Sequence, residues 1–196
     1  MKDALIIFQK NPEPGKVKTR LAATIGNEKA LIVYKVLVDH THQIVSELEA
    51  DKFLYFSSFI DDSPEWDGYN KKVQKGDDLG LRMYNAIEEV RALGYERIIV
   101  IGTDCFELSS EIVTQAFLSL RESDYVIGPA IDGGYYLIGT HNPDKEVFIG
   151  KEWSTENVFV EATKNIASVN KTLSILEALP DVDYEEDLKS LKEYIV

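Results

Sequence analysis

Cysteine is nearly absent from this 196-residue chain, which has one, Cys105, together with three histidines. A single cysteine excludes an internal disulfide and a cysteine-built metal site, and it suits a reducing cytoplasm. We expect Cys105 to pack as a small apolar side chain. His40, His42 and His141 lack the spacing of metal ligands, and we interpret the first two as helix-surface residues.

Long apolar runs are also lacking. The first run, residues 4–8, is far too short for a signal peptide or a membrane span. No internal repeat, low-complexity tract or linker divides the chain. Its length and its 44% hydrophobic content fit one globular domain over residues 1–196. We therefore expect a soluble, cytoplasmic, single-domain protein.

Basic residues are scarce, since 21 of them face 34 acidic residues and the formal net charge is −13. A surface of this sign repels nucleic acid and anionic membranes, so we expect neither as a partner. A cluster of bases in this chain therefore points to a local role, because the charge of the whole protein does not attract an anion.

Short apolar runs alternate with helical periodicity along the chain. They predict strands over 4–8, 53–59, 72–74, 97–101, 125–128 and 135–139. Helices are predicted over 27–48, 78–93 and 109–121, after Ser154, and from Asp183. This alternation indicates a layered α/β domain with a largely parallel sheet, in which 135–139 is the candidate antiparallel strand. Ligands of such sheets bind beyond the carboxyl ends of the strands.

A basic loop follows the first predicted strand. It holds four bases within eleven residues, Lys10, Lys16, Lys18 and Arg20. Lys18 offers a point charge, and Arg20 offers a planar fork that can grip two phosphate oxygens. The turn-forming residues that would let backbone amides approach an anion are Pro12, Pro14 and Gly15. No Gly-Lys-Ser/Thr closes the loop, so it is not a Walker loop. The alternative is a solvated basic loop.

Asp104 follows the buried apolar run 97–101, within Gly102-Thr103-Asp104-Cys105. A carboxylate at a strand end can bind Mg²⁺ or Mn²⁺, which would neutralise a diphosphate. One carboxylate makes a poor metal site, and the candidate partners are Asp132, Asp181 and Asp183. The alternatives are that Asp104 caps a turn and that Asp183 serves only as a helix N-cap.

Three further segments have the composition of binding loops. Asp132-Gly133-Gly134-Tyr135-Tyr136 allows close ligand approach, although Asp-Gly is also a common hairpin turn. Gly76 and Arg82, near a helix start, suit an anion or a nucleobase, or are a plain helix N-terminus. Trp153-Ser154-Thr155 is an aromatic platform for an acceptor, or a packed tryptophan beside a helix cap.

Five motifs occur in one order along nearly the whole chain. They are Lys10-x-Pro12-x-Pro14-Gly15-x-x-Lys18-Thr19-Arg20-Leu21, Gln74-x-Gly76-x-Asp78-Leu79-Gly80-x-Arg82-Met83, Gly102-Thr103-Asp104-Cys105, Gly128-Pro129-Ala130-x-Asp132-Gly133-Gly134-Tyr135-Tyr136 and Trp153-Ser154-Thr155. The series resembles a bacterial family of nucleotide-diphospho-sugar transferases, described as glycosyltransferases associated with radical-SAM enzymes or arsenosugar biosynthesis. The resemblance implies a Rossmann-like three-layer GT-A fold with a mostly parallel mixed sheet.

More distantly, the chain is similar to phospholactate and molybdenum-cofactor guanylyltransferases. Those share the basic loop and the aspartate after a central strand, and the comparison makes Asp181 and Asp183 a candidate metal pair acting with Asp104. The chain departs from the family pattern at Phe106, where proline is usual, and at Tyr184, where threonine is common.

Glycosyl transfer from a nucleotide-diphospho-sugar to a small-molecule acceptor is the leading hypothesis. Mg²⁺ or Mn²⁺ on Asp104, Asp183 and Asp181 would stabilise the leaving diphosphate, and Asp132 would orient the sugar or activate the acceptor. The expected nucleotide- or phosphate-binding residues are Lys10, Pro14, Gly15, Lys18, Thr19, Arg20, Gly76 and Arg82. The expected substrate or acceptor residues are Gly133, Gly134, Tyr135, Trp153 and Ser154.

Two alternatives stay open. One is nucleotidyl transfer, in which an NTP and a phosphorylated acceptor release pyrophosphate. The other is a catalytically silent nucleotide-binding domain, because a fold alone does not establish catalysis.

Overall fold

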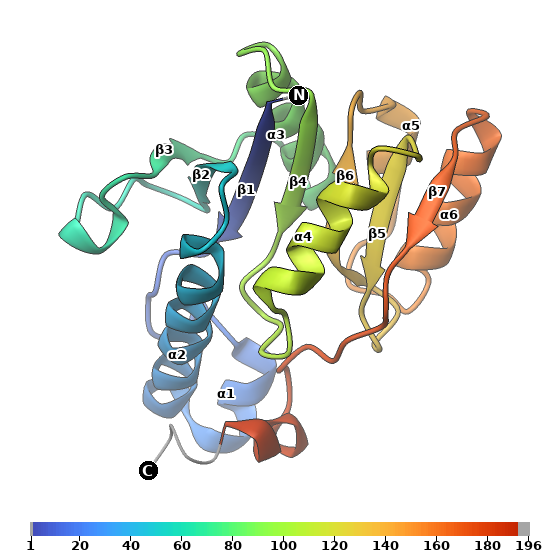
Figure 1. Ribbon diagram of the computed structural model, residues 1–196. Helices are drawn as coiled ribbons and strands as arrows, with labels where there is room; N and C mark the ends of the chain where they lie inside the picture. The colour runs from blue at the N-terminus through green and yellow to red at the C-terminus, as the bar shows by residue number, and fades with distance from the viewer. Residues whose placement is uncertain (1, 192–196) are drawn as a thin grey trace.

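The computed structural model describes residues 2–191, and within them the strands form one seven-stranded sheet in the order β3-β2-β1-β4-β6-β5-β7. In this part of the chain only β6 runs antiparallel to its neighbours, so the mixed, mostly parallel sheet is confirmed (Figure 1). The strands are β1 Asp3–Gln9, β2 Asp51–Phe56, β3 Asn70–Val73, β4 Arg97–Ile101, β5 Tyr125–Pro129, β6 Tyr135–Thr140 and β7 Leu173–Ile175.

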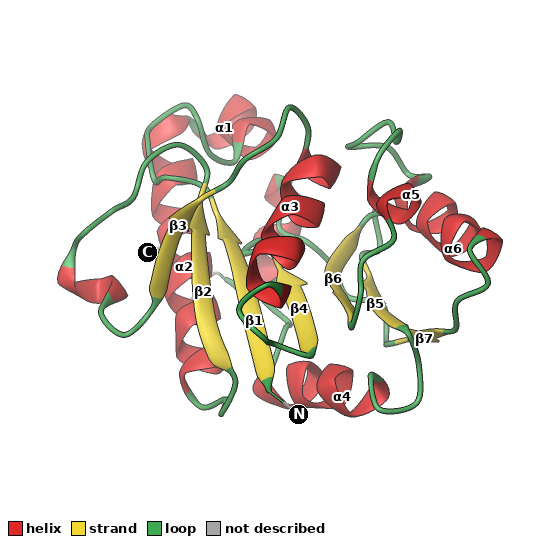
Figure 2. Cartoon of the chain, turned by 90° about the horizontal axis from the view of Figure 1, so that it is seen from above, coloured by secondary structure: helices red, strands yellow, loops and turns green. Residues whose placement is uncertain are grey.

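Helices cover both faces of the sheet and complete three layers (Figure 2). On one face lie α2 (Asn27–Ser46) and α4 (Ser110–Ser119). On the other lie α3 (Leu79–Arg91), α5 (Lys145–Phe148) and α6 (Val158–Ser168). Two 3₁₀ turns, Pro64–Trp66 and Glu185–Ser190, and the short α1 (Thr19–Ile25) lie in the connections. Among residues 2–191 no helix is long and apolar enough to cross a membrane.

The central strands are apolar on both sides because each face is covered. In β1, Leu5 and Ile7 pack into the core beneath α2 and α4, while Ala4 and Ile6 pack into the core beneath α3, α5 and α6. Successive side chains of a strand point to opposite faces, so one continuous apolar run serves two cores. The sheet thus places the ends of β1 and β4 side by side in the middle of the molecule.

Several element boundaries differ from the sequence-based predictions. The second strand ends at Phe56 instead of residue 59 because Asn11 takes over the backbone groups that follow it. The helix predicted from Asp183 is a 3₁₀ turn, and the carboxylate of Asp187 accepts the backbone N–H groups of Asp183 and Tyr184. The N-cap role for Asp183 is therefore wrong. α6 begins only at Val158, so Ser154 does not cap it either.

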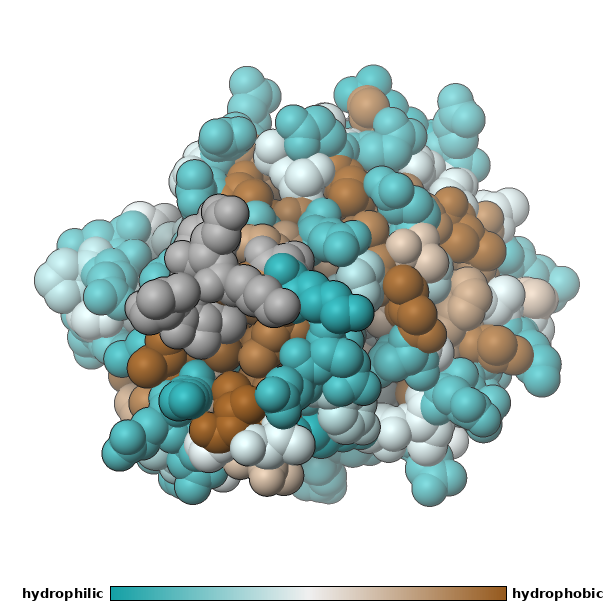
Figure 3. All heavy atoms as spheres, turned by 90° about the horizontal axis from the view of Figure 1, so that it is seen from below, coloured by the Kyte–Doolittle hydropathy of each residue, from teal (hydrophilic) through white to brown (hydrophobic). Residues whose placement is uncertain are grey.

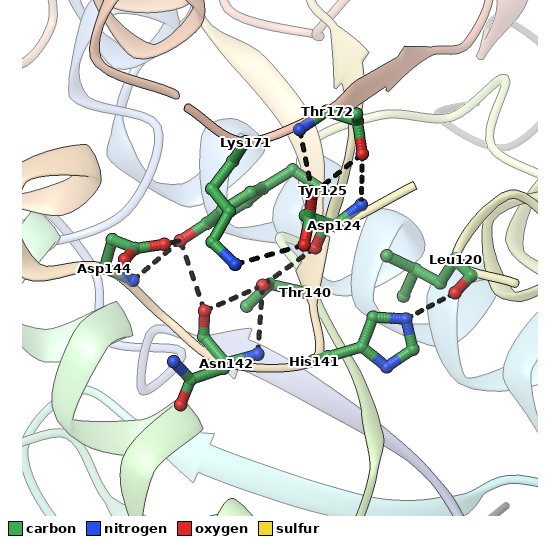
Figure 4. A network of polar contacts seen from close by, with 9 residues as sticks. All are labelled: Leu120, Asp124, Tyr125, Thr140, His141, Asn142, Asp144, Lys171 and Thr172. Carbon is green, nitrogen blue, oxygen red and sulfur yellow. Dashed lines mark hydrogen bonds and ion pairs between the residues drawn. The ribbon is translucent and has the colours of Figure 1, made fainter. Parts of the chain in front are cut away.

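A polar network lies at the end of the sheet where β5 begins, away from the carboxyl ends of β1 and β4. It fixes β7 beside β5 (Figure 4). The carboxylate of Asp124 accepts the N–H of Thr172 at 2.9 Å, its hydroxyl at 2.8 Å and the ammonium of Lys171 at 3.1 Å. The hydrogen bond from the Thr172 backbone is the main reason that the pKa of Asp124 falls to about 2. The hydroxyl of Thr140 donates to the carbonyl of Asp124, which ties in β6. This network serves the fold.

The two helix histidines are not free surface residues. His40 Nε2 contacts the carbonyl of Leu108 at 3.1 Å and its ring packs on Phe106. His42 contacts Tyr69 OH and Gln9 Oε1, both at 2.8 Å, and its ring lies 4.3 Å from that of Trp66. Burial lowers the pKa of His42 to about 4. Their interpretation as helix-surface residues is wrong because loops after β2 and β4 cover this side of α2.

We predict that His42 makes the fold sensitive to acid. Its unfolded pKa is about 6.5, so the unfolded chain takes up a proton that the folded one refuses, and stability falls as the pH drops from there toward 4. Urea unfolding should show that the free energy of unfolding falls by roughly 2 kcal/mol more in wild type than in His42→Gln when the pH is lowered from about 7.5 to about 5.

Tyr69→Phe is the control, since it removes a hydrogen bond to His42 but no group that titrates in this range. An equal fall in wild type and His42→Gln contradicts the prediction.

Candidate active site

A cleft of about 630 Å³ opens at the carboxyl ends of β1 and β4. The connections leaving these two neighbouring strands run in opposite directions along the sheet, which is where open α/β sheets bind ligands. Figure 3 looks onto this end of the molecule, where hydrophilic side chains gather with a few hydrophobic ones among them. The charged residues that line the cleft are Lys10, Lys18, Arg20, Arg82, Asp104, Asp132, Asp181 and Asp183.

The loop after β1 is held in place by Asn11, which is fully buried. Its amide donates to the carbonyl of Phe59 at 3.0 Å, and its Oδ1 accepts the backbone N–H groups of Ser58 and Phe59. Lys10, Lys18, Thr19 and Arg20 then line the cleft, as predicted for phosphate-binding residues. Pro14 and Gly15 are exposed and do not line it.

The other base of this loop, Lys16, points away from the cleft. Its ammonium pairs with Glu13 at 3.0 Å and stays exposed. The sequence allowed either a phosphate-binding loop or a solvated basic loop. The loop contains both kinds of base, since Lys10, Lys18 and Arg20 line the cleft and Lys16 is solvated.

Lys18 lies at the centre of the charged half of the cleft. Its ammonium contacts Oδ1 of Asp104 and lies 3.4 Å from Oδ1 of Asp183. Arg20 Nη1 binds the other oxygen of Asp183 at 2.9 Å. The Lys18 side chain is only 3% exposed, whereas that of Asp104 is 46% exposed. The carboxylate of Asp104 is thus open to a ligand, and its partner is the buried ammonium.

Asp181 and Asp183 reach this point through a strap formed by residues 176–183. Leu179 N–H donates to Pro129 O at 3.1 Å, and Ile131 N–H donates to Leu179 O at 3.0 Å. Val182 N–H then donates to the carbonyl of Asp104 at 2.9 Å. The strap crosses the end of the sheet from β5 to β4, so residues about eighty positions apart in sequence become neighbours.

The cleft shifts the pKa values of its charged groups in opposite directions. Burial acts to raise the pKa of Asp104, but the ammonium of Lys18 outweighs it and the pKa is lowered. Burial likewise acts to lower the pKa of Lys18, and Asp104 and Asp183 together raise it. Burial, followed by the nearby charge of Asp104, raises the pKa of Asp181 to about 7. One oxygen of Asp181 is buried without a hydrogen-bond partner.

These carboxylates fit a metal only with help from a ligand. No three acidic, histidine or cysteine side chains within residues 2–191 lie close enough to hold an ion by themselves. Asp104 and Asp183, however, converge on one cation, the ammonium of Lys18. Mg²⁺ is usually held by one or two carboxylates together with phosphate oxygens and water. The donor set therefore suits a divalent ion that arrives with a phosphate ligand.

Asp132 lies in the turn between β5 and β6 and lines the cleft. Its Oδ1 accepts the N–H of Gly134 at 2.9 Å, which fixes the side chain in an exposed position. Gly133 has a φ of 94°, and a Cβ there would lie 2.2 Å from the carbonyl oxygen of Glu156. Gly133 thus holds the turn against the start of α6 and does not line the cleft, whereas Gly134 does.

The opposite wall of the cleft is largely aromatic and apolar. Trp153 packs on the first turn of α3, where a Cβ on Gly80 would lie 2.6 Å from the indole. The rings of Tyr135 and Trp153 meet edge to face at 6.2 Å. Tyr135 OH and Trp153 Nε1 are both buried without a hydrogen-bond partner, and Ser154 completes this wall.

Arg82 also lines the cleft, while Gly76 does not. Arg82 Nε donates to the carbonyl of Gly76 at 2.9 Å. A Cβ on Gly76, whose φ is 146°, would lie 2.8 Å from the backbone nitrogen of Arg82. Gly76 therefore positions the arginine and lies outside the lining of the cleft.

Tyr34 is a further residue of the cleft, and its place there is not indicated by the sequence pattern. It lines the cleft, donates from its hydroxyl to Lys10 O at 2.9 Å and accepts from Thr103 Oγ1 at 3.5 Å. It thereby joins the loops after β1 and β4. In the sequence it occupies one apolar position of an amphipathic helix, and the single signal of another role is its hydroxyl.

Comparison with known proteins gives a family match and a series of similar solved structures. The model of a family described as uncharacterized proteins conserved in bacteria (DUF2064) matches residues 42–155. A crystal structure of a putative nucleotide-diphospho-sugar transferase from Desulfovibrio desulfuricans superposes with a TM-score of 0.89 at 36% sequence identity. That match covers 97% of this chain and 87% of the other. No curated protein matches the chain.

More distant structures share the fold alone. One is a CMP:2-keto-3-deoxy-manno-octonic acid synthetase complexed with CTP, with 11% identity, a TM-score of 0.58 and 98% of each chain covered. Another is a 4-diphosphocytidyl-2C-methyl-D-erythritol synthase from Anaerococcus prevotii. It has 13% identity and a TM-score of 0.59, with 99% of this chain and 96% of the other covered.

We predict that Asp181 costs the fold stability once it ionises. Its folded pKa of about 7 lies above the unfolded value of 3.8, so the folded state binds the proton more tightly and stability falls as the pH rises from about 4 to 7. Asp181→Asn should raise the free energy of unfolding by about 4 kcal/mol at about pH 8. This gain should fall to roughly 2 kcal/mol at about pH 5, as measured by urea unfolding.

Asp183→Asn is the matched control. Because Asp183 forms ion pairs with Lys18 and Arg20, its substitution should lower the free energy of unfolding at both pH values. A destabilised Asp181→Asn protein at about pH 8 would show that ionised Asp181 is well solvated or paired.

Proposed function

This chain belongs to the DUF2064 family, and its relative of 36% identity from Desulfovibrio desulfuricans is described as a putative nucleotide-diphospho-sugar transferase. From this we propose that the chain is a transferase acting on nucleotides. More specifically, we propose that it moves a sugar from a nucleotide-diphospho-sugar to a small-molecule acceptor. Mg²⁺ or Mn²⁺ is the proposed cofactor.

The observation that carries this proposal is the meeting of Lys18, Arg20, Asp104 and Asp183 in one cleft. The two bases suit the oxygens of a diphosphate, and the two carboxylates suit a divalent ion bound with it. In a protein of formal charge −13, four bases lining one cleft mark a place where an anion can bind.

In the proposed reaction the acceptor oxygen bonds to the anomeric carbon of the sugar. The bond from that carbon to the diphosphate breaks, and the nucleoside diphosphate leaves. Lys18 and Arg20 stabilise the charge that develops on the leaving group. Asp132, exposed on the turn after β5, accepts the proton of the acceptor hydroxyl. Asp104 and Asp183 would hold a divalent ion, which would supply further charge neutralisation.

The aromatic wall has a complementary place in this proposal. Trp153 and Tyr135 line the cleft together with the phosphate-binding bases, and their rings meet edge to face. Such a wall suits an acceptor or sugar that packs a ring against it.

Nucleotidyl transfer is the second candidate. Lys10, Lys18 and Arg20 all line the cleft, and three bases match the larger charge of a triphosphate. A synthetase complexed with CTP also shares the fold.

The two reactions release different products. We predict that incubation with nucleotide-diphospho-sugars and Mn²⁺ releases a nucleoside diphosphate, whereas incubation with NTPs releases no pyrophosphate. Pyrophosphate formed from an NTP and a phosphorylated acceptor would select the second candidate. Tight nucleotide binding with neither product would select a silent binding domain.

We predict that Asp104→Ala weakens nucleotide binding in the presence of Mn²⁺ by at least about tenfold, because one of two metal ligands is lost. Isothermal titration calorimetry with the nucleotide that best stabilises the wild type measures this. Asp39→Ala, an exposed acid on α2, is the control for the change in net charge. Unchanged binding by Asp104→Ala removes Asp104 from the metal site.

A further inference from the structure

The ammonium of Lys18 lies between the two proposed metal ligands. It contacts Asp104 Oδ1 and lies 3.4 Å from Asp183 Oδ1. Arg20 binds the remaining oxygen of Asp183 at 2.9 Å. Two bases of the β1 loop therefore already neutralise both carboxylates.

The backbone holds Lys18 in this place. Lys18 has φ 46° and ψ 46°, a left-handed conformation that is uncommon for a residue other than glycine. It immediately precedes α1, and its carbonyl accepts the N–H of Ala22 at 2.8 Å. Such a conformation persists only where the surroundings determine it, and here the chain direction and two ion pairs do so.

A divalent ion cannot share this position with the ammonium. It would compete for the same Oδ1 atoms, and two cations at contact distance in a partly buried cleft repel strongly. Lys18 would have to move first. A side chain only 3% exposed does not readily leave two carboxylates unless another anion receives it. A phosphate group in the same cleft is such an anion.

We propose that Lys18 keeps the metal position closed in the free protein, so that a divalent ion and a phosphate-bearing ligand bind only together. The inference rests on the proposed function, from which it takes Asp104 and Asp183 as metal ligands. As the ligand enters, the ammonium moves from the carboxylates to the phosphate and the divalent ion takes its place. No covalent bond changes in this exchange.

The exchange has a thermodynamic signature. If the ligand removes the competing ammonium, each partner must raise the affinity of the other by the same factor. The part of this coupling that comes from displacing the ammonium depends on Lys18, because only its side chain contacts both carboxylates among the bases that the structure describes. The phosphate oxygens that help to hold the ion add a part that does not depend on Lys18. The neighbouring Lys16 pairs with Glu13 outside the cleft and provides a matched control.

Equilibrium dialysis of the whole protein against Mn²⁺ tests this, with inorganic diphosphate as a probe that needs no knowledge of the base or sugar. Wild type, Lys18→Met and Lys16→Met are compared at equal free Mn²⁺, with and without diphosphate. We expect Lys18→Met to bind Mn²⁺ alone about tenfold more tightly than wild type or Lys16→Met. Diphosphate should tighten Mn²⁺ binding in all three proteins, because it supplies metal ligands, but by about tenfold more in wild type and Lys16→Met than in Lys18→Met.

Wild type that binds Mn²⁺ alone as tightly as Lys18→Met overturns the inference and leaves the proposed function standing. Mn²⁺ retained by no variant in any condition removes the metal from the proposed function and the inference with it. Circular dichroism checks that Lys18→Met is folded. If it is not, the wild-type comparison decides, and equal Mn²⁺ binding with and without diphosphate overturns the inference.

Discussion

The ion pairing of Lys18 with Asp104 and Asp183 is the interaction on which the cleft depends. It joins three segments through opposite charges: the loop after β1, the loop after β4 and the strap that ends at residue 183. A buried ammonium is stable only when it is paired, and a cluster of carboxylates is stable only when its charge is offset. The ammonium and the carboxylates therefore stabilise each other. This pairing matters more in a chain whose net charge is negative.

The sheet makes this pairing possible by bringing β1 and β4 together as neighbours. Their apolar side chains serve two cores, so the strands are fixed from both faces and their ends move little relative to each other. Asn11 and Tyr34 then extend that order into the loops through hydrogen bonds to backbone carbonyls. Apolar packing thus fixes the strands, hydrogen bonds fix the loops, and the loops in turn position the charged groups of the cleft.

Much of this could be predicted from the sequence, and the exceptions have physical causes. Residues 97–101 form a strand as predicted because a continuous apolar run between turn signals has few alternatives. The short β7 and α5 were missed because a few residues carry no measurable period. His42 was misplaced because periodicity shows which face of a helix is apolar but not which loop covers its edge. Among the site residues, Lys18, Arg20 and Asp104 could be chosen from loop position, whereas the separate roles of Gly76 and Gly133 depend on close contacts that only the folded chain defines.

The strap over residues 176–183 has a consequence for local stability. It is attached by backbone hydrogen bonds, of which Val182 N–H to Asp104 O is the one nearest the cleft, by the buried side chains of Leu179 and Val182, and by the ion pairs of Asp183. A local opening of the strap would withdraw Asp181 and Asp183 while β1 and β4 stayed folded, and such an opening costs at most the free energy of global unfolding. The completeness of the cleft is therefore limited by the local stability of this one segment.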